Sequence, residues 1–189
     1  MFDLIKELKE YQSFDAREEK NRLEVIKFLE NNTNCYSRTN LAGHITAGGF
    51  VADDKGNILL NHHRKSGMWF QFGGHSDNDE NSLNVAKREI SEEAGIEDLE
   101  LVSDKIFCVG VQTIPNSEKK KEPEHFHYDI NFLFFVKNHN FKLSNESTEI
   151  KWVTIEEARN LVDQNDYDMH RMIDKYEQIL KTKYCGKNI

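Results

Sequence analysis

The chain has few cysteines and no long apolar run. Cys35, Cys108 and Cys185 are odd in number and widely spaced, which fits neither a disulfide framework nor a zinc motif. We expect reduced thiols. No apolar run approaches membrane-spanning length, and the first eleven residues mix charged with apolar side chains, unlike a signal peptide. These absences favour a cytoplasmic protein that has no membrane partner.

Positive charge is also scarce. The 189-residue chain carries 25 Lys and Arg against 33 Asp and Glu, and its net charge is −8. Because a nucleic-acid backbone requires a basic face, nucleic acid is not expected as the main partner. A phosphate substrate bridged by a metal ion is compatible with this charge. No internal repeat or low-complexity tract is present, and the length fits one domain of about 150 residues with additional segments.

One stretch concentrates acidic residues in an unusual pattern. Glu89, Glu92 and Glu93 stand at i, i+3 and i+4, so their carboxylates share one face if the stretch is helical. Like charges at this spacing destabilise an isolated helix, whereas a hard divalent cation such as Mg²⁺ or Mn²⁺ would neutralise them. Taken alone, the three glutamates also fit a solvated acidic helix face. The adjoining stripe is apolar and consists of Leu83, Ala86, Ile90 and Ala94.

The spacing around the glutamates decides between these interpretations. The defined positions of the Nudix box are all matched, by Gly74, Glu80, Arg88-Glu89-Ile90, Glu92-Glu93 and Gly95-Ile96. The chain therefore resembles the Nudix hydrolases. The resemblance implies a pyrophosphohydrolase that depends on Mg²⁺ or Mn²⁺ and cleaves a nucleoside diphosphate linked to another group. It also implies an α/β fold, the Nudix α/β/α sandwich with a mixed sheet.

The resemblance assigns roles to individual residues by their position in the box. Glu89, Glu92 and Glu93 would bind the metal, with the carbonyl of Gly73 as a further ligand. Arg88 would orient a carboxylate through charge-assisted hydrogen bonds. A carboxylate, either Glu89 or one from a distant loop, would accept the proton of the attacking water.

Residues outside the box complete the predicted site. In Nudix enzymes an acidic residue from a loop on the far side of the sheet often joins the metal or acts as base. Glu149 and Glu146 are the candidates, and Glu149 is preferred. Arg64 and Lys65 would meet substrate phosphates near the mouth of the cleft, although a basic hairpin end is also common without such a role.

Residues 125–136 alternate strictly and predict a long strand. Its second face begins with His125, His127, Asp129 and Asn131 before it turns apolar, so we expect the polar end to line a cleft. We assign His125 and His127 to substrate contact. A transition-metal site and an ordinary hydrogen-bonded surface are the alternatives. The first face should point into a core throughout and comprises Phe126, Tyr128, Ile130, Phe132, Phe134 and Val136.

Helices are predicted at both ends of the chain. Residues 15–30 predict a helix with Leu23, Ile26 and Leu29 on one side, and Thr154 with Glu157 forms a capping-box pattern. Further helices are expected at 2–11 and 169–184, and further strands at 44–52, 57–62, 68–72, 99–111 and 150–153. Residues 115–124 predict a polar loop.

We divide the chain into three parts. Residues 1–42 form an N-terminal helical extension, residues 43–165 the Nudix domain, and residues 166–189 a C-terminal helix packed on that domain. The N-terminal extension either covers the core or builds a homodimer contact.

Two other functions share the fold. A non-catalytic nucleotide-binding or regulatory module has no reason to retain clustered negative charge. An isopentenyl-diphosphate isomerase needs a suitably placed cysteine, for which Cys108 is the only core candidate. The substrate itself is not specified, since nucleoside triphosphates, ADP-ribose, dinucleotide polyphosphates, coenzyme A and capped RNA 5′ ends all contain the anhydride. A capped RNA end is the only nucleic-acid partner that we expect.

Overall fold

Strand β1 (Gly43–Ala52) is buried along its whole length and organises the sheet. The structure, a computed structural model, describes residues 2–118 and 122–185, without the side chains of the last two. Part of the predicted 115–124 loop, the end of the C-terminal segment and the Cys185 side chain therefore lie outside the described residues. The other elements are α1 (Leu4–Glu10), α2 (Ala16–Asn31), β2 (Asn57–His63), β3 (Trp69–Phe70), β4 (Phe72–His75), α3 (Ser82–Ala94), β5 (Glu100–Leu101), β6 (Cys108–Ile114), β7 (His125–Phe135), β8 (Ser147–Thr154), α4 (Ile155–Leu161) and α5 (Tyr167–Cys185).

The sheet is mixed, as predicted. On one edge β1 pairs in parallel with β7 over its full length, from Gly43 opposite Phe126 to Ala52 opposite Phe135. On the other edge its middle residues, Thr46 to Gly49, pair with β4 and its last two residues with β2, both antiparallel. Strands β5 and β6 continue the sheet beyond β7, while β3 and β8 flank β2. This arrangement holds the glycine turn of the box, in β4, against the central strand.

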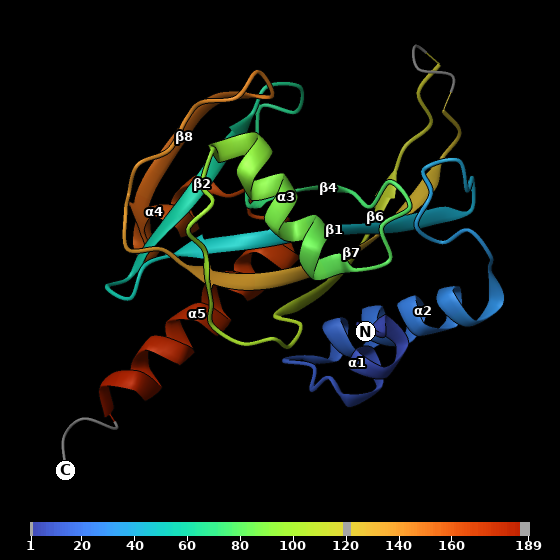
Figure 1. Cartoon of the computed structure of the whole chain (residues 1–189), viewed down its shortest axis with the longest axis horizontal. Helices are drawn as coiled ribbons and strands as arrows, with labels where there is room; N and C mark the ends of the chain where they lie inside the picture. Colours follow the sequence, from blue (N-terminus) through green and yellow to red (C-terminus); the bar gives the residue numbers. More distant parts are fainter. Residues whose placement is uncertain (1, 119–121, 186–189) are drawn as a thin grey trace.

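Helices cover both faces of the sheet, which confirms the predicted layered α/β class (Figure 1). Helices α1, α2 and α3 share one apolar core with alternate residues of β1 and β7, including Ile45, Ile90 and Phe132. Helices α4 and α5 pack on the opposite core, around Phe50, Leu133 and Tyr176. None of the helices in the described part of the chain combines the length and apolar character that a membrane crossing requires.

Helix α2 begins and ends within one residue of its predicted bounds, but its predicted apolar side is only partly buried. Leu23 is 52% exposed, whereas Glu18 is fully buried. The Glu18 carboxylate accepts hydrogen bonds from the hydroxyl of Tyr11 (2.6 Å) and from the backbone N–H of Val109 (3.1 Å), and it pairs with Lys175 of α5 (3.3 Å). Because these partners satisfy its charge, Glu18 can be buried together with Asn21, Val25 and Phe28, and this face of α2, not the one with Leu23, is turned inward.

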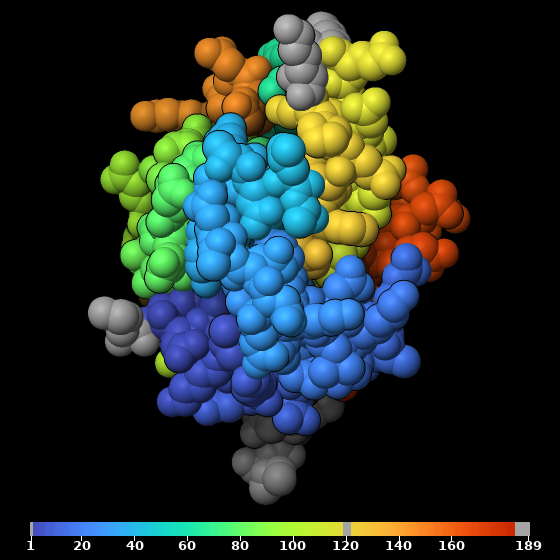
Figure 2. Space-filling model, turned by 90° about the vertical axis from the view of Figure 1, so that its right-hand side faces the viewer, coloured from blue at the N-terminus to red at the C-terminus, as the bar shows by residue number. Residues whose placement is uncertain are grey.

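The N-terminal helices cover the core rather than standing apart from it. Figure 2 shows them (blue) below the first strand residues, between the box segment (green) and the C-terminal helix (orange-red). A second ion pair strengthens this packing, because Arg171 of α5 is buried and binds Asp15, the cap of α2, at 2.7 Å.

Three strand predictions needed correction. The strand expected at 99–111 is two strands, β5 and β6, which pair with different parts of β7. Strand β8 begins at Ser147, three residues before the expected start. Phe126 was expected to face the core but is 36% exposed, because the β6–β7 hairpin extends beyond the helices at this end (Figure 1).

Candidate active site

Helix α3 carries the glutamates and has well-defined ends. At its start the Asn81 side chain accepts the backbone N–H groups of Leu83 and Asn84. At its end Gly95 adopts a left-handed conformation (φ 64°) and donates its N–H to Ser91. Both are standard solutions for the unpaired groups at helix termini. The helix is thus fixed over one face of the sheet, and its glutamates with it.

The three glutamates of the box differ in burial. Glu89 and Glu93 are only 9% and 6% exposed, respectively. Glu92 faces solvent, with 59% of its side chain exposed. As the i, i+3, i+4 pattern predicted, the carboxylates lie at the boundary between the buried and the solvent side of the helix.

Burial raises the pKa of both buried carboxylates. Burial raises the pKa of Glu93 to about 8, and the negative charges of Glu89 and Glu146 contribute to this rise. The Gly73 N–H donates a hydrogen bond to Glu93 Oε2 (3.1 Å), which opposes it. Burial also raises the pKa of Glu89, against the attraction of Arg88. Oxygen donors that crowd negative charge in this way fit a hard divalent cation, which takes carboxylate ligands and neutralises both groups.

The paired glycines of β4 allow the glutamates to approach the backbone. A Cβ atom on Gly74 would lie 2.6 Å from Glu89 Oε2, and one on Gly73 would lie 2.9 Å from the Cα of Gly48. Neither contact is tolerable without movement. The glycines are therefore required by close approach, to a carboxylate in one case and to the neighbouring strand in the other.

Arg88 connects α3 to β4. Its Nη1 lies 2.8 Å from Glu89 Oε1 and 3.3 Å from Glu92 Oε2, and its Nη2 donates to the carbonyl of His75 at 2.8 Å. A guanidinium with these three partners fixes the direction of two box carboxylates.

A cleft of about 580 Å³ brings most of the predicted site residues together. Its walls include the box residues and one end of β1, β4 and β7. The predicted residues among its lining are Gly73, Arg88, Glu89, Glu92, Glu93, Lys65, His125 and His127. Arg64 and Glu149 are not among its described lining residues.

Glu146, not Glu149, is the loop glutamate in the cleft. Because β8 starts at Ser147, Glu149 lies within the strand, opposite His62, and its side chain is exposed. Glu146 lies in the turn before the strand, lines the cleft, and contributes to the raised pKa values of Glu89 and Glu93. The predicted preference is reversed by the earlier strand start.

Arg64 holds this turn instead of lining the cleft. Its side chain donates to the carbonyls of Asn145 (2.9 Å) and Ser147 (2.7 Å), and its backbone N–H donates to the carbonyl of Glu146 (2.8 Å). Three consecutive carbonyls are thus bound by one residue. The guanidinium donors expected to meet phosphate are used to position the Glu146 turn.

The histidine end of the cleft contains two residues that the sequence did not indicate. His44 of β1 stands opposite His127 in the parallel register, and its ring lies 4.7 Å from the His127 ring and 5.1 Å from the His75 ring, between centroids. The pairing of β1 with β7 brings His44 to His127, and the pairing of β1 with β4 brings His75 to both; no local sequence signal predicts these pairings.

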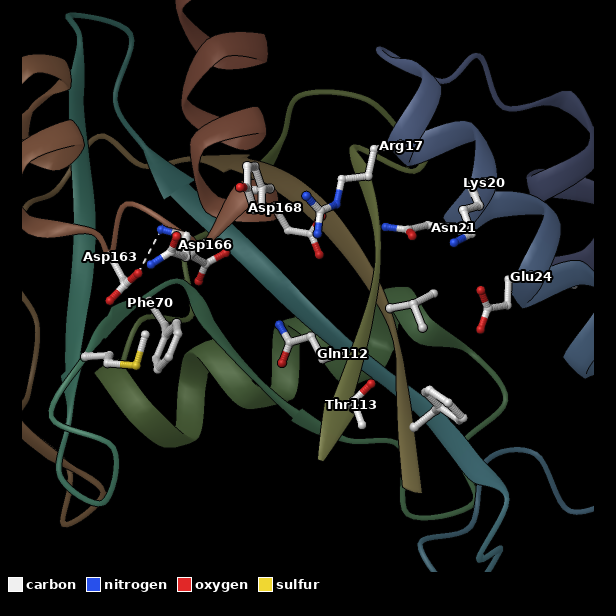
Figure 3. A pocket seen from close by; sticks show the side chains of 15 residues that line it. Arg17, Lys20, Asn21, Glu24, Phe70, Gln112, Thr113, Asp163, Asp166 and Asp168 are labelled. Carbon is white, nitrogen blue, oxygen red and sulfur yellow. Dashed lines mark hydrogen bonds between the residues drawn. The ribbon is translucent and has the colours of Figure 1, made fainter. Parts of the chain in front are cut away.

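A second hollow, of about 670 Å³, adjoins the cleft (Figure 3). It lies between α2, β6 and the segment before α5, and shares Phe70 and Gln112 with the cleft. Acidic residues (Asp163, Asp166 and Asp168) face it on one side and Arg17 and Lys20 on the other. None of the box residues in the described part of the chain lines it. The chemistry of the box therefore belongs to the smaller cleft.

Cys108 is excluded from the cleft. Its side chain is fully buried in the core beneath α5, and burial raises the pKa of its thiol. The cysteine that an isomerase site would require is thus on the wrong side of the sheet from the box.

The comparisons with known proteins agree with this geometry. No curated protein sequence matches the chain. Among solved structures, a C. elegans Ap4A hydrolase in a binary complex has a TM-score of 0.55 at 22% identity and covers 73% of this chain and 98% of its own. The MutT protein of Methanosarcina mazei Go1 has a TM-score of 0.55 at 23% identity, and the match covers 72% of this chain and 95% of that protein. The E. coli dihydroneopterin triphosphate pyrophosphohydrolase has a TM-score of 0.56 at 15% identity, and the match covers 73% of this chain and 95% of that protein.

These solved structures share the fold of the chain. The model of the NUDIX domain matches residues 43–176, which is well over half of the sequence and includes the whole glutamate cleft except its Arg38 to Leu41 rim. The protein therefore belongs to the NUDIX family, as a hydrolase of phosphoanhydride bonds.

Proposed function

We propose that the protein is a pyrophosphohydrolase that requires Mg²⁺ or Mn²⁺ and cleaves the anhydride of a nucleoside diphosphate linked to a second group. The observation that carries this proposal is the pair of buried carboxylates, Glu89 and Glu93, held against Gly73 and Gly74 at the base of a cleft. Such a pair is costly for the fold unless a cation compensates it.

The proposal gives each residue a task. Glu89, Glu92 and Glu93, with the Gly73 carbonyl, would hold the ion, and Arg88 keeps two of these carboxylates in place. When bound, the ion would neutralise charge on the phosphoryl oxygens and acidify a water.

The proton of the attacking water would pass to a carboxylate. Glu146 is exposed on its turn and lines the cleft, so its carboxylate can accept a proton and return it to solvent. We therefore propose Glu146 as the base in place of Glu149, with Glu89 as the alternative. Arg64 would act only by positioning the Glu146 turn.

The shape of the site supports a substrate with two groups flanking the anhydride. Phe70 and Gln112 line both hollows, so a molecule whose phosphates lie near the glutamates has room to extend along either. Lys65, His125 and His127 line the cleft and would contact phosphate or ribose. By their names, the C. elegans protein hydrolyses Ap4A and the E. coli protein cleaves dihydroneopterin triphosphate, and both substrates contain phosphoanhydrides.

The test is a substrate panel with purified protein in Mg²⁺ or Mn²⁺. Dinucleotide polyphosphates, ADP-ribose, nucleoside triphosphates, coenzyme A and a capped RNA 5′ end would be incubated in ¹⁸O-water, and the products identified by mass. We expect one compound to be cleaved at its anhydride, with ¹⁸O in a single phosphate product and no turnover in EDTA.

Glu93→Gln and Glu97→Gln form the matched pair of variants. Glu93→Gln should fold but lose most turnover, whereas Glu97→Gln, at an exposed position just beyond the helix, should keep it. Near-normal turnover by Glu93→Gln would refute the assignment. Metal binding without cleavage of any compound would favour the binding-module alternative.

A further inference from the structure

The histidine end of the cleft has the features of a separate metal site. The side chains of His44, His125 and His127 each offer a ring nitrogen, and these atoms lie within 4.8 Å of one another. All three residues line the cleft. They come from the start of β1 and the start of β7, which the parallel register fixes side by side.

His44 is the first indication of a ligand. The residue is only 2% exposed, and neither of its ring nitrogens has a hydrogen-bond partner in the described part of the chain. Buried polar atoms are almost always paired, so an orphaned imidazole needs an explanation. A neutral imidazole keeps a lone pair that can bind a metal.

The geometry of the other two histidines is the second indication. His125 Nε2 and His127 Nε2 face each other at 3.3 Å. Two nitrogens that bind one tetrahedral zinc ion at 2.0–2.1 Å stand about 3.3–3.4 Å apart. His125 Nδ1 lies 2.9 Å from the carbonyl of Pro123, which fixes the ring orientation. Metal-binding histidines characteristically use their other ring nitrogen in this way.

We propose that His44, His125 and His127 bind a late first-row divalent ion of the zinc type, in addition to the ion proposed at the glutamates. His125 and His127 would then meet a substrate phosphate through this ion. Three imidazoles suit Zn²⁺ and disfavour Mg²⁺, which prefers oxygen ligands. Three protein ligands leave one position of a tetrahedral ion, and because the residues line the cleft, that position is accessible to water or to a phosphate oxygen. The two ends of the cleft would thus select different metals by ligand chemistry.

The test is calorimetric titration of the metal-free, full-length protein with Zn²⁺ in a large excess of Mg²⁺. Mg²⁺ occupies carboxylate sites and leaves imidazoles free, so the expected result is one Zn²⁺ per chain. His125→Ala and His127→Ala remove ring nitrogens from side chains that are only partly buried. Each should weaken Zn²⁺ binding by more than about 100-fold, because residues that only orient such ligands already contribute 10–100-fold.

Two control variants distinguish binding at these three histidines from binding elsewhere on the protein. His139→Ala removes a histidine that pairs with Asp53 and stacks on Trp152, and should leave Zn²⁺ binding unchanged. Glu93→Gln should also leave it unchanged, so failure of the proposed hydrolase function and failure of this site are distinguishable. Co²⁺ provides a second readout, with visible absorption bands of a tetrahedral ion in wild type and their loss in His127→Ala.

Two results would overturn the proposal. One is the absence of Zn²⁺ uptake in excess Mg²⁺. The other is equal uptake by wild type and by both His125→Ala and His127→Ala, which would place the ion elsewhere.

Discussion

Replacing Gly74 by alanine should damage the site and spare the fold. The new Cβ would lie 2.6 Å, 2.7 Å and 2.8 Å from the carboxylate atoms of Glu89, whereas ordinary contact begins at 3.4 Å. The carboxylate must therefore move by about 0.8 Å, while the backbone need not, because Gly74 is not among the glycines with positive φ. The clash falls on the mobile end of a side chain.

The magnitude follows from how sharply the chemistry depends on position. A displacement of about 1 Å in a catalytic arrangement can cost 10²-fold in rate, so we expect kcat/KM to fall by about 10- to 100-fold. Glycine to alanine at a compatible backbone angle stabilises by about 0.4–1 kcal/mol, so Tm should stay constant or rise slightly. Turnover would be measured on the compound identified by the panel. Mn²⁺ binding, followed by electron paramagnetic resonance, should weaken in parallel and needs no substrate.

Gly73→Ala is the contrasting variant. Its Cβ would meet backbone, at 2.9 Å from the Cα of Gly48 and 3.0 Å from the carbonyl of Ala47, so β1 and β4 must separate. We expect a loss of about 1–3 kcal/mol and a lower Tm. The reasoning would be refuted if Gly74→Ala retained full turnover and Mn²⁺ affinity, or if both variants lost stability equally.

Three further predictions concern residues around the site. Arg64→Lys keeps the positive charge but loses the paired donors that hold the Glu146 turn, so kcat should fall about tenfold in steady-state assays. If Arg64 only attracted phosphate, lysine would replace it without this loss. Burial, with a contribution from Arg38, lowers the pKa of His75 from 6.5 to about 4. Between pH 6.5 and pH 4 the unfolded chain therefore binds more protons at His75 than the folded chain does, so the Tm of the metal-free protein should fall as the pH falls from about 6.5 to 4. His75→Asn should reduce this dependence of Tm on pH. Glu18→Gln leaves the largely buried Lys175 without its charged partner, so the free energy of unfolding should fall by about 3 kcal/mol. By calorimetry, Tm should fall by about 6–12 °C while kcat stays unchanged. An unaltered Tm would contradict the packing argument.

Local patterns in the sequence were sufficient to predict how the box carboxylates are arranged on their helix. The i, i+3, i+4 spacing depends only on helix geometry, and Glu89 and Glu93 lie where it places them. The capping box of Thr154 and Glu157 is likewise confirmed, since each residue binds the backbone of the other. These features are determined within a few residues, so no tertiary contact can move them.

Contacts between distant segments were beyond the reach of the same reasoning. The burial of Glu18 depends on its pairing with Lys175, which is 157 residues away, and no local pattern indicates that contact. His44 joins His127 through a parallel register that a strand pattern alone does not define. The choice of Glu146 over Glu149 depends on where β8 starts, and strand ends are set by the pairing partner rather than by local propensity.

Strand β4 links the two ends of the cleft and explains why both can belong to one site. Gly73 binds the Glu93 carboxylate through its N–H, and two residues later the His75 ring contacts the rings of His44 and His127. The same short strand is held by β1 on one edge and by Arg88 through the His75 carbonyl. A four-residue strand with these restraints cannot shift at one end without moving the other. The carboxylates and the imidazoles therefore line one cleft, and a single short strand connects the two groups.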